Sequence, residues 1–316
     1  MKILKLPLLA CLFAIGFTAC ESDPLGGDNN PDPTPTATYT SINELLEDMA
    51  PPVQTFGFDA DDGGVFTTPR GSQITIPSSA FVGLNGQPIS GNVQLEFQEI
   101  FTRTDMMTTG VTTVSNNALL NSGGAYTIDV TQNGQSLAVA PNASIEVRIP
   151  EQAVDPGMQI FVGQNLGTGS NNTWQLPDSA TTFNFLRDNG FYQITSQYLG
   201  WVNCDAFYQA GILDPIHFDL LGVQGLDYTN TIIFGYAHGI NNLFNPWKLA
   251  NASFVNSQMR NYRLPNVNQT IIVLTLKQGQ FYYGTLNINP PVAGTTYAIQ
   301  MNAVTQADIQ NFLANL

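Results

Sequence analysis

The stretch YTIDVTQNGQSLAVA, residues 126–140, decides the fold class. In its first half Tyr126, Ile128 and Val130 occupy alternate positions, so they share one face of a β-strand. Asn133-Gly134 follows, and this pair accepts the two positive φ angles of a type I′ turn. The residues after the turn supply a second short strand. The pattern predicts an antiparallel hairpin.

Similar strand patterns recur on both sides of this hairpin. The clearest alternation of apolar and polar residues is in 73–76, 93–98 and 145–149. Further predicted strands are 159–162, 191–195, 217–223, 231–236, 271–276, 280–288 and 297–301, with a turn at 277–280. Short strands at regular spacing, separated by turn residues, are typical of a β-sandwich. We predict an all-β protein built from two β-sandwich (Ig-like) domains.

A short helix is predicted at each end of this β-rich region. Ser41-Ile-Asn-Glu44 has the pattern of a capping box, so a helix should begin there and end near Met49, before Pro51-Pro52. Thr305 is a predicted N-cap near the C-terminus. The apolar residues of the closing helix then share one face: Ile309, Phe312 and Leu313.

The chain is expected to divide into five parts. Residues 163–188 are rich in Gly, Asn, Ser and Thr, which suggests a connection between two units. The expected parts are a signal peptide 1–19, a flexible linker 20–40, a first β-sandwich with its leading helix 41–165, a joining segment 166–187, and a second β-sandwich with a closing helix 188–316.

The N-terminus resembles the leader of a bacterial lipoprotein. Lys2 and Lys5 precede an apolar run from Leu6 to Phe17, which has the length of a signal-peptide core and is too short to cross a bilayer as a helix. Small residues then lead to Cys20, the residue that the resemblance identifies as cleaved and acylated. An ordinary secretory signal, with Cys20 as a bystander, is the alternative. A lipid on Cys20 would make the membrane a partner.

Glu21-Ser22-Asp23 follows Cys20 and resembles the surface-export signal of Bacteroidetes lipoproteins. The resemblance implies an outer-membrane lipoprotein exposed on the cell surface. The alternatives are retention on the periplasmic leaflet and a simple hydrophilic tether.

Composition argues against nucleic acid as a partner. The leader holds two lysines and no acid, so the remaining chain keeps 8 basic and 24 acidic residues, a net charge of −16. Affinity for phosphates comes from Lys and Arg. After removal of the leader and acylation of Cys20, Cys204 would be the single remaining cysteine, which excludes an intramolecular disulfide.

Several phrases resemble a family of Bacteroidetes cell-envelope lipoproteins. They include Gly71-Ser-Gln-Ile-Thr-Ile-Pro77, Asn121-Ser-Gly-Gly124 and Gly200-Trp-Val-Asn-Cys-Asp205. The N-terminal module of that family is similar to the β-sandwich shared by ankyrins, netrin receptors and zonula occludens proteins. The resemblance implies protein contacts and no enzymatic activity.

Gly200–Asp205 is also the strongest candidate for a ligand site in the sequence. Trp201 could stack on a ligand while Asn203 and Asp205 make polar contacts; Trp247 is a further candidate for stacking on sugars. The alternative for Gly200–Asp205 is structural, with a core tryptophan and polar side chains that bond to the backbone.

The other motifs give weaker indications. Asp59, Asp61 and Asp62 could contribute to a calcium loop, although the EF-hand spacing fails because Arg70 stands where the bidentate glutamate belongs. Ser179, in Asp178-Ser-Ala180, resembles an O-glycosylation acceptor. His217 and His238 lack the paired spacing of a zinc site.

The sequence predicts no catalytic residue and no cofactor. It contains neither a Gly-x-Ser-x-Gly motif nor a glycine-rich phosphate loop. We expect a non-catalytic, membrane-anchored envelope lipoprotein that binds or scaffolds an unidentified protein or glycan. The alternatives are a carbohydrate-binding accessory lipoprotein of a glycan-uptake system and a pilus-type adhesin subunit that assembles by strand addition.

Overall fold

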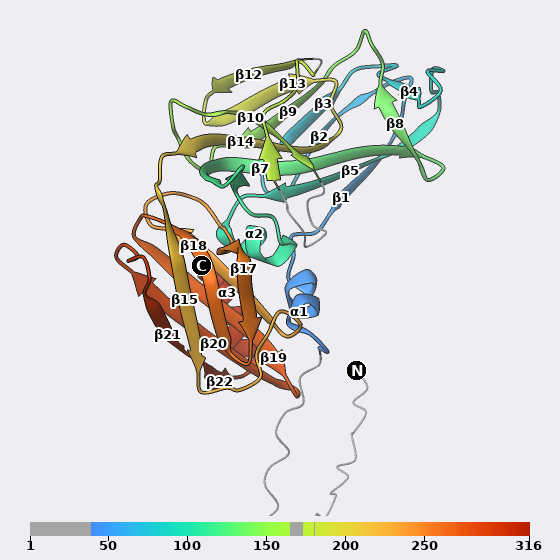
Figure 1. Cartoon of the computed structure of the whole chain (residues 1–316). Helices are drawn as coiled ribbons and strands as arrows, with labels where there is room; N and C mark the ends of the chain where they lie inside the picture. Colours follow the sequence, from blue (N-terminus) through green and yellow to red (C-terminus); the bar gives the residue numbers. More distant parts are fainter. Residues whose placement is uncertain (1–38, 165–172, 180) are drawn as a thin grey trace, which may run out of the picture. The chain divides into compact units, whose positions relative to one another are not determined.

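The computed structural model describes residues 39–164, 173–179 and 181–316, and most of them form antiparallel strands (Figure 1). Up to residue 188 the elements are α1 Ile42–Asp48, β1 Gln54–Asp59, β2 Gly64–Thr67, β3 Gln73–Ile76, β4 Phe81–Gly83, β5 Asn92–Ile100, α2 Arg103–Thr109, β6 Val114–Ser115, β7 Ala118–Gln132, β8 Gln135–Val139, β9 Ile145–Pro150, β10 Gln159–Gln164, β11 Thr173–Gln175 and β12 Phe183–Asp188. The later elements are β13 Phe191–Ser196, β14 Gly200–Tyr208, β15 Ile212–Leu221, β16 Thr231–Ala237, β17 Trp247–Val255, β18 Gln258–Pro265, β19 Gln269–Lys277, β20 Gln280–Ile288, β21 Thr296–Gln300, β22 Asn302–Val304 and α3 Gln306–Ala314. The prediction of an all-β protein with short helices is confirmed.

The first sandwich packs two sheets around one apolar core. One sheet has the order β1-β5-β7-β14-β10-β11, and the other has the order β12-β13-β9-β3-β2. Inward-facing residues of both sheets meet in the core; examples are Leu95 of β5, Ile128 of β7, Val147 of β9 and Ile194 of β13. These residues alternate with more exposed ones along each strand, as expected when one face of a sheet is buried.

The hairpin predicted at residues 126–140 is confirmed. β7 and β8 pair antiparallel at Thr131↔Ser136 and Gln132↔Gln135. Asn133 and Gly134 connect them with φ angles of 52° and 77°, the two positive values that a type I′ turn requires.

The second sandwich comprises the strands from β15 onward. Its sheets have the orders β17-β18-β15-β21 and β16-β19-β20-β22. Their shared core includes Phe218, Leu264, Ile271 and Ile299. β16 and β17 are the edge strands of their sheets.

The strand pairing divides the chain at a different place from the one the sequence suggested. β13 pairs with β9, and β14 lies between β7 and β10. Strands β12, β13 and β14 therefore belong to sheets of the first sandwich, although they fall largely within the expected second domain, 188–316. Their position is set by pairing with strands that are distant in the sequence. The local composition of residues 183–208 does not indicate this pairing.

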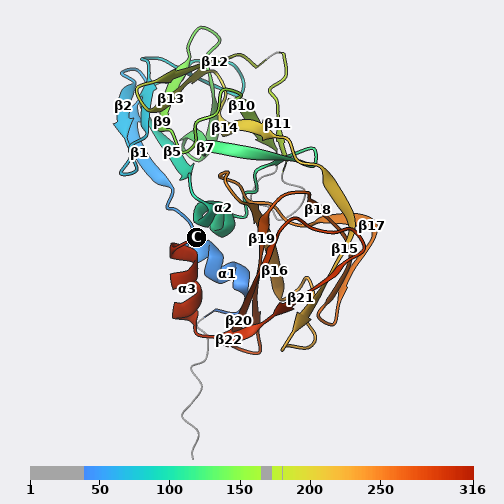
Figure 2. The ribbon, with the colours of Figure 1, turned by 90° about the vertical axis from the view of Figure 1, so that its left-hand side faces the viewer.

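The three helices of the described residues lie close to one another (Figure 2), and their apolar side chains share a third cluster. Leu45 of α1, Met106 of α2 and Leu313 of α3 pack in it with Leu274 of β19. β19 is buried along nearly its whole length because its other face lies in the core of the second sandwich. The helices thus cover one face of the β16-β19-β20-β22 sheet.

Both predicted helices begin at the N-cap residues that the sequence indicated. Ser41 caps α1 by accepting a hydrogen bond from the Glu44 amide, but the Glu44 carboxylate bonds to Thr40 and not to the N-cap amide. The backbone amide of Thr40 is the main reason that the pKa of Glu44 is lowered. Thr305 caps α3 in a complete capping box with Asp308. The sequence analysis did not predict α2.

Candidate functional site: a cleft at the edge of the second sandwich

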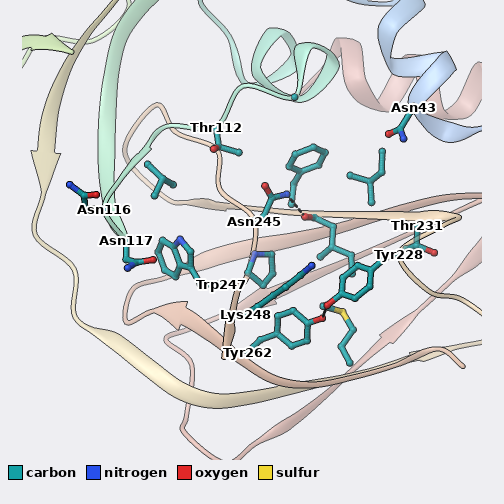
Figure 3. Close-up of a pocket in the computed structure, with 17 residues that line it drawn as sticks. Asn43, Thr112, Asn116, Asn117, Tyr228, Thr231, Asn245, Trp247, Lys248 and Tyr262 are labelled. Atoms are coloured by element: carbon teal, nitrogen blue, oxygen red, sulfur yellow. Dashed lines mark hydrogen bonds between the residues drawn. The ribbon is translucent and has the colours of Figure 1, made fainter. Parts of the chain in front are cut away.

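A cleft of about 770 Å³ opens beside β16 and β17, each of which is one of the two edge strands of its sheet in the second sandwich (Figure 3). Residues from segments 110–117, 228–234 and 245–248 line it, together with Met259 and Tyr262 of β18 and Asn43 of α1. The lining therefore combines five separate parts of the chain, and its aromatic side chains are Tyr228, Phe234, Trp247 and Tyr262.

The loop between β16 and β17 determines where the cleft begins. Part of the free edge of β16 is hydrogen-bonded to this loop: Gly235 of β16 and Phe244 of the loop exchange two backbone hydrogen bonds. The side chain of Asn242 bonds to Ala237 in the same way. The last bond of this kind runs from Asn245 Nδ2 to the carbonyl oxygen of Ile233 at 2.8 Å. No further hydrogen bond of this kind joins the loop to β16 among the described residues, and the next residues of the strand, Ile232 and Thr231, line the cleft.

Trp247 begins β17 and presents a large aromatic surface to the cleft. Its ring packs nearly parallel to the buried ring of Phe244, with centroids 5.7 Å apart and an interplanar angle of 16°. The side chain is only partly buried. This contact holds the indole in one orientation before any ligand arrives, which reduces the entropy lost on binding.

Lys248 and two tyrosines form the neighbouring wall. The ammonium of Lys248 lies 3.8 Å from the centroid of the Tyr228 ring, a cation–π contact. The hydroxyl groups of Tyr228 and Tyr262 hydrogen-bond to each other. Burial, followed by this hydrogen bond, raises the pKa of Tyr262, so its phenol is neutral at physiological pH.

Asparagine side chains form the third part of the lining. Asn116 and Asn117 connect β6 to β7 with φ angles of 46° and 67°, and both are exposed. In Figure 3 the amide of Asn117 points toward the Trp247 indole. Asparagine adopts positive φ more readily than most residues, which is why two can stand in a two-residue turn. Each amide offers both a hydrogen-bond donor and an acceptor.

The lining suits reversible binding of a polar ligand. It combines a fixed aromatic face, neutral amides and one ammonium group. Among the described residues that line it, none is a carboxylate, an imidazole or a thiol.

Of the ligand-contact candidates from the sequence, the structure places only Trp247 in this cleft. Trp201 lies in β14, partly buried, with its ring edge-on to Trp174 at 6.5 Å. Asn203 and Asp205 are fully buried in the same strand. Asn203 Nδ2 donates to Asp205 Oδ2 at 2.6 Å, and Ser122 Oγ donates to Asn203 Oδ1 at 3.1 Å.

Burial dominates the electrostatics of Asp205. It raises the pKa of this carboxyl well above its ordinary value, although hydrogen bonds from Ser122 and Asn203 act in the opposite direction. Its Oδ1 atom has no hydrogen-bond partner in the described part of the chain. Cys204, which lies between Asn203 and Asp205 in the sequence, is also buried, and desolvation raises the pKa of its thiol. Asn203, Cys204 and Asp205 are thus buried in strand β14, but Trp201 is only partly buried, and the polar side chains bond to each other and to Ser122 and not to the backbone of a turn.

The remaining candidates lie apart from the cleft. Asp59, Asp61 and Asp62 occupy a turn in which Asp59 Oδ1 accepts the Asp61 amide at 3.0 Å and Asp61 Oδ2 accepts the Gly91 amide at 3.3 Å. No group of three or more metal-binding side chains occurs among the described residues. Ser179 is exposed. Cys20 lies outside the described residues.

The two histidines hold structural positions. Nδ1 of His217 accepts the Asn261 amide at 3.1 Å, and Nε2 of His238 lies 2.9 Å from the Thr270 hydroxyl. Neither lines the cleft.

Sequence reasoning missed Tyr228, Lys248 and the asparagines of the lining. One local signal was present, because Asn116-Asn117 is a suitable pair for a tight hairpin turn. Nothing in the sequence indicates that this turn would lie near the start of β17.

Searches for related proteins and for long membrane-crossing helices gave negative results. In the described part of the chain, no helix has the length and apolar character needed to span a bilayer. No protein-family model matches the sequence, and no curated protein is significantly similar to it.

Proposed function

We propose that this protein is a non-catalytic, lipid-anchored binding protein of the cell envelope that binds a carbohydrate in the cleft at Trp247. The observation that carries the proposal is the lining of that cleft: an indole fixed by Phe244 faces a set of neutral amides. The anchor is supported by the leader sequence that ends at Cys20.

The chemistry of a sugar ring fits such a lining. One face of many sugar rings is a patch of C–H groups, which can pack on an aromatic plane, while the hydroxyl groups at the rim need hydrogen-bond partners. Trp247 offers the plane, and Asn116 and Asn117 offer donors and acceptors at the mouth. The cleft is also large enough for a small oligosaccharide, since ligand sites generally range from about 300 to 1,000 Å³.

A pair of tryptophan variants tests the site. Screening on a glycan array should identify a binder, and Trp247→Leu should then weaken its binding by roughly 30-fold or more, because loss of a central aromatic anchor typically costs about 2 kcal/mol. Trp201→Leu is the matched control: it removes a second partly buried indole, but from β14, outside the cleft. Titration calorimetry measures both affinities.

An asparagine pair tests the amides without straining the backbone. Asn117→Gly removes an amide from the cleft and keeps the positive φ angle, and Asn189→Gly does the same at an exposed turn of the first sandwich. Only the first should weaken binding. Failure of every glycan on the array to bind the wild-type protein, or equal effects of Trp247→Leu and Trp201→Leu, would contradict the proposal.

A cysteine variant tests the anchor. Cys20→Ser removes the thiol to which the lipid would be attached, so labelling of producing cells with a tagged fatty acid should label the wild-type protein and leave the variant unlabelled. Mass spectrometry of the wild-type N-terminus should find an acylated Cys20. A mature form without acyl groups at this residue would rule the anchor out.

A further inference from the structure

Lys248 differs from every other cation in the described part of the chain. Among the eight described Lys and Arg residues, five arginines form ion pairs with carboxylates: Arg70, Arg148, Arg187, Arg260 and Arg263. Arg103 and Lys277 donate to backbone carbonyl groups. Lys248 alone has neither kind of partner; its ammonium lies over the Tyr228 ring.

The position of this ammonium is within the cleft. Lys248 is the single charged side chain among the described residues that line it, and it follows Trp247 directly in β17. Its exposed side chain runs along the same wall as the Tyr228–Tyr262 pair (Figure 3). An anionic ligand in the cleft would therefore meet an ammonium without a competing carboxylate in the lining.

The unpaired Lys248 stands out because the protein as a whole is strongly acidic. With a net charge of −16 outside the leader, the protein repels anions over most of its surface. A cleft that has one unpaired cation and no acid in its lining is complementary to a ligand with negative charge. A neutral sugar hydroxyl could accept only a weaker hydrogen bond from Lys248, whereas a sugar carboxylate would gain an ionic hydrogen bond in which both partners are charged.

We infer that the carbohydrate recognised by the cleft is acidic and that Lys248 binds its carboxylate while the sugar ring packs on Trp247. This inference rests on the proposed carbohydrate-binding function and specifies the class of ligand. Asn116 and Asn117 would bind the remaining hydroxyl groups of the same sugar.

The test uses matched pairs of sugars. The probes are oligosaccharides that contain uronic acids, each paired with its counterpart in which the carboxyl groups have been reduced to alcohols. The acidic member should bind about tenfold or more tightly, which corresponds to roughly 1.4 kcal/mol. Added salt should weaken binding of the acidic member and leave the reduced member unaffected, because the charges are exposed to solvent.

Lysine variants test whether Lys248 is the residue responsible for the preference for acidic over reduced sugars. Lys248→Met keeps the apolar stem over Tyr228 and removes the charge, so it should abolish the difference in affinity between the paired sugars. Lys248→Arg should retain the preference. Lys277→Met is the control, since it removes the same charge from a residue outside the cleft and should leave the preference unchanged.

The outcomes separate this inference from the proposed function. Equal affinity for acidic and reduced sugars, combined with loss of both in Trp247→Leu, would overturn the inference and leave carbohydrate binding in place. A preference for acidic sugars that survives in Lys248→Met would also overturn it. Absence of binding to all paired sugars, in a protein that binds other neutral glycans, overturns the inference alone; absence of binding to any glycan overturns both.

Discussion

At the scale of single residues, Asp205 shows how burial decides between two meanings of one motif. The sequence Asn203-Cys-Asp205 is compatible with a ligand site and with a buried polar cluster. In the structure all three side chains are inaccessible, and the carboxyl bonds to Asn203. Sequence alone could not distinguish these cases, because whether a strand is central or at an edge depends on partners far along the chain.

The raised pKa of Asp205 predicts a specific dependence of stability on pH. In the folded protein burial raises the pKa of this carboxyl well above its value in the unfolded chain, which is about 3.9. Between those two pKa values the folded state holds one more proton, so this residue makes stability fall as pH rises, by about 1.4 kcal/mol per pH unit. Below pH 3.9 both states are protonated, and the effect vanishes.

Asp205→Asn removes this titration while preserving the shape of the side chain. The variant should gain stability relative to the wild type as pH rises above about 4, and urea unfolding at a series of pH values measures the difference. Parallel pH profiles for the two proteins would show that Asp205 does not titrate in this way.

At the scale of elements, the features that the sequence predicted correctly are set by neighbouring residues, although α2, which also has a local capping box, was missed. The β7–β8 hairpin, the N-cap of α1 and the apolar face of α3 all follow from patterns within about fifteen residues. The pairing of β13 with β9 and the insertion of β14 between β7 and β10 follow from contacts between distant segments. The cleft belongs to this second class, so Trp247 could be suspected from sequence but its companions could not.

Two glycines in turns should respond differently to the same substitution. Gly134 and Gly63 both have positive φ angles, 77° and 70°. A Cβ at Gly134 meets nothing within 4 Å, so Gly134→Ala should cost only the backbone strain, about 1–2 kcal/mol.

A Cβ at Gly63 would overlap the carbonyl oxygen of Ile76 in the neighbouring strand. Gly63→Ala should therefore add the cost of overpacking and lose roughly 3 kcal/mol in total. Unfolding in urea provides both values. A loss at Gly134 as large as the loss at Gly63 would mean that steric overlap is not the difference between them.

At the scale of the whole molecule, polar contacts join the two sandwiches within the unit of residues 37–316. The side chain of Asn241, in the loop after β16, donates to the carbonyl oxygens of Phe101 at 3.0 Å and Ser122 at 3.1 Å. Thr104 of α2 donates to the carbonyl oxygen of Leu313 in α3. Residues of both sandwiches also pack in the apolar cluster of the three helices, so we expect the two sandwiches to stabilise each other.

Asn241→Ala tests this dependence. Loss of two hydrogen bonds should lower the free energy of unfolding by about 1–3 kcal/mol. Asn302→Ala, which removes one long and exposed local bond, should change it by less than about 0.5 kcal/mol. Calorimetry of both variants and the wild type provides the comparison; an Asn241→Ala melting curve identical to that of the wild type would argue against a stabilising role for these bonds.

The place of β14 has a consequence for how the chain is made. A polypeptide leaves the ribosome N-terminus first, so β7 and β10 emerge well before β14, the strand that hydrogen-bonds to both. Until Tyr208 has followed, the growing chain exposes two sheet edges that lack their partner. A chaperone that binds this chain during synthesis would find exposed strand edges chiefly in that incomplete state.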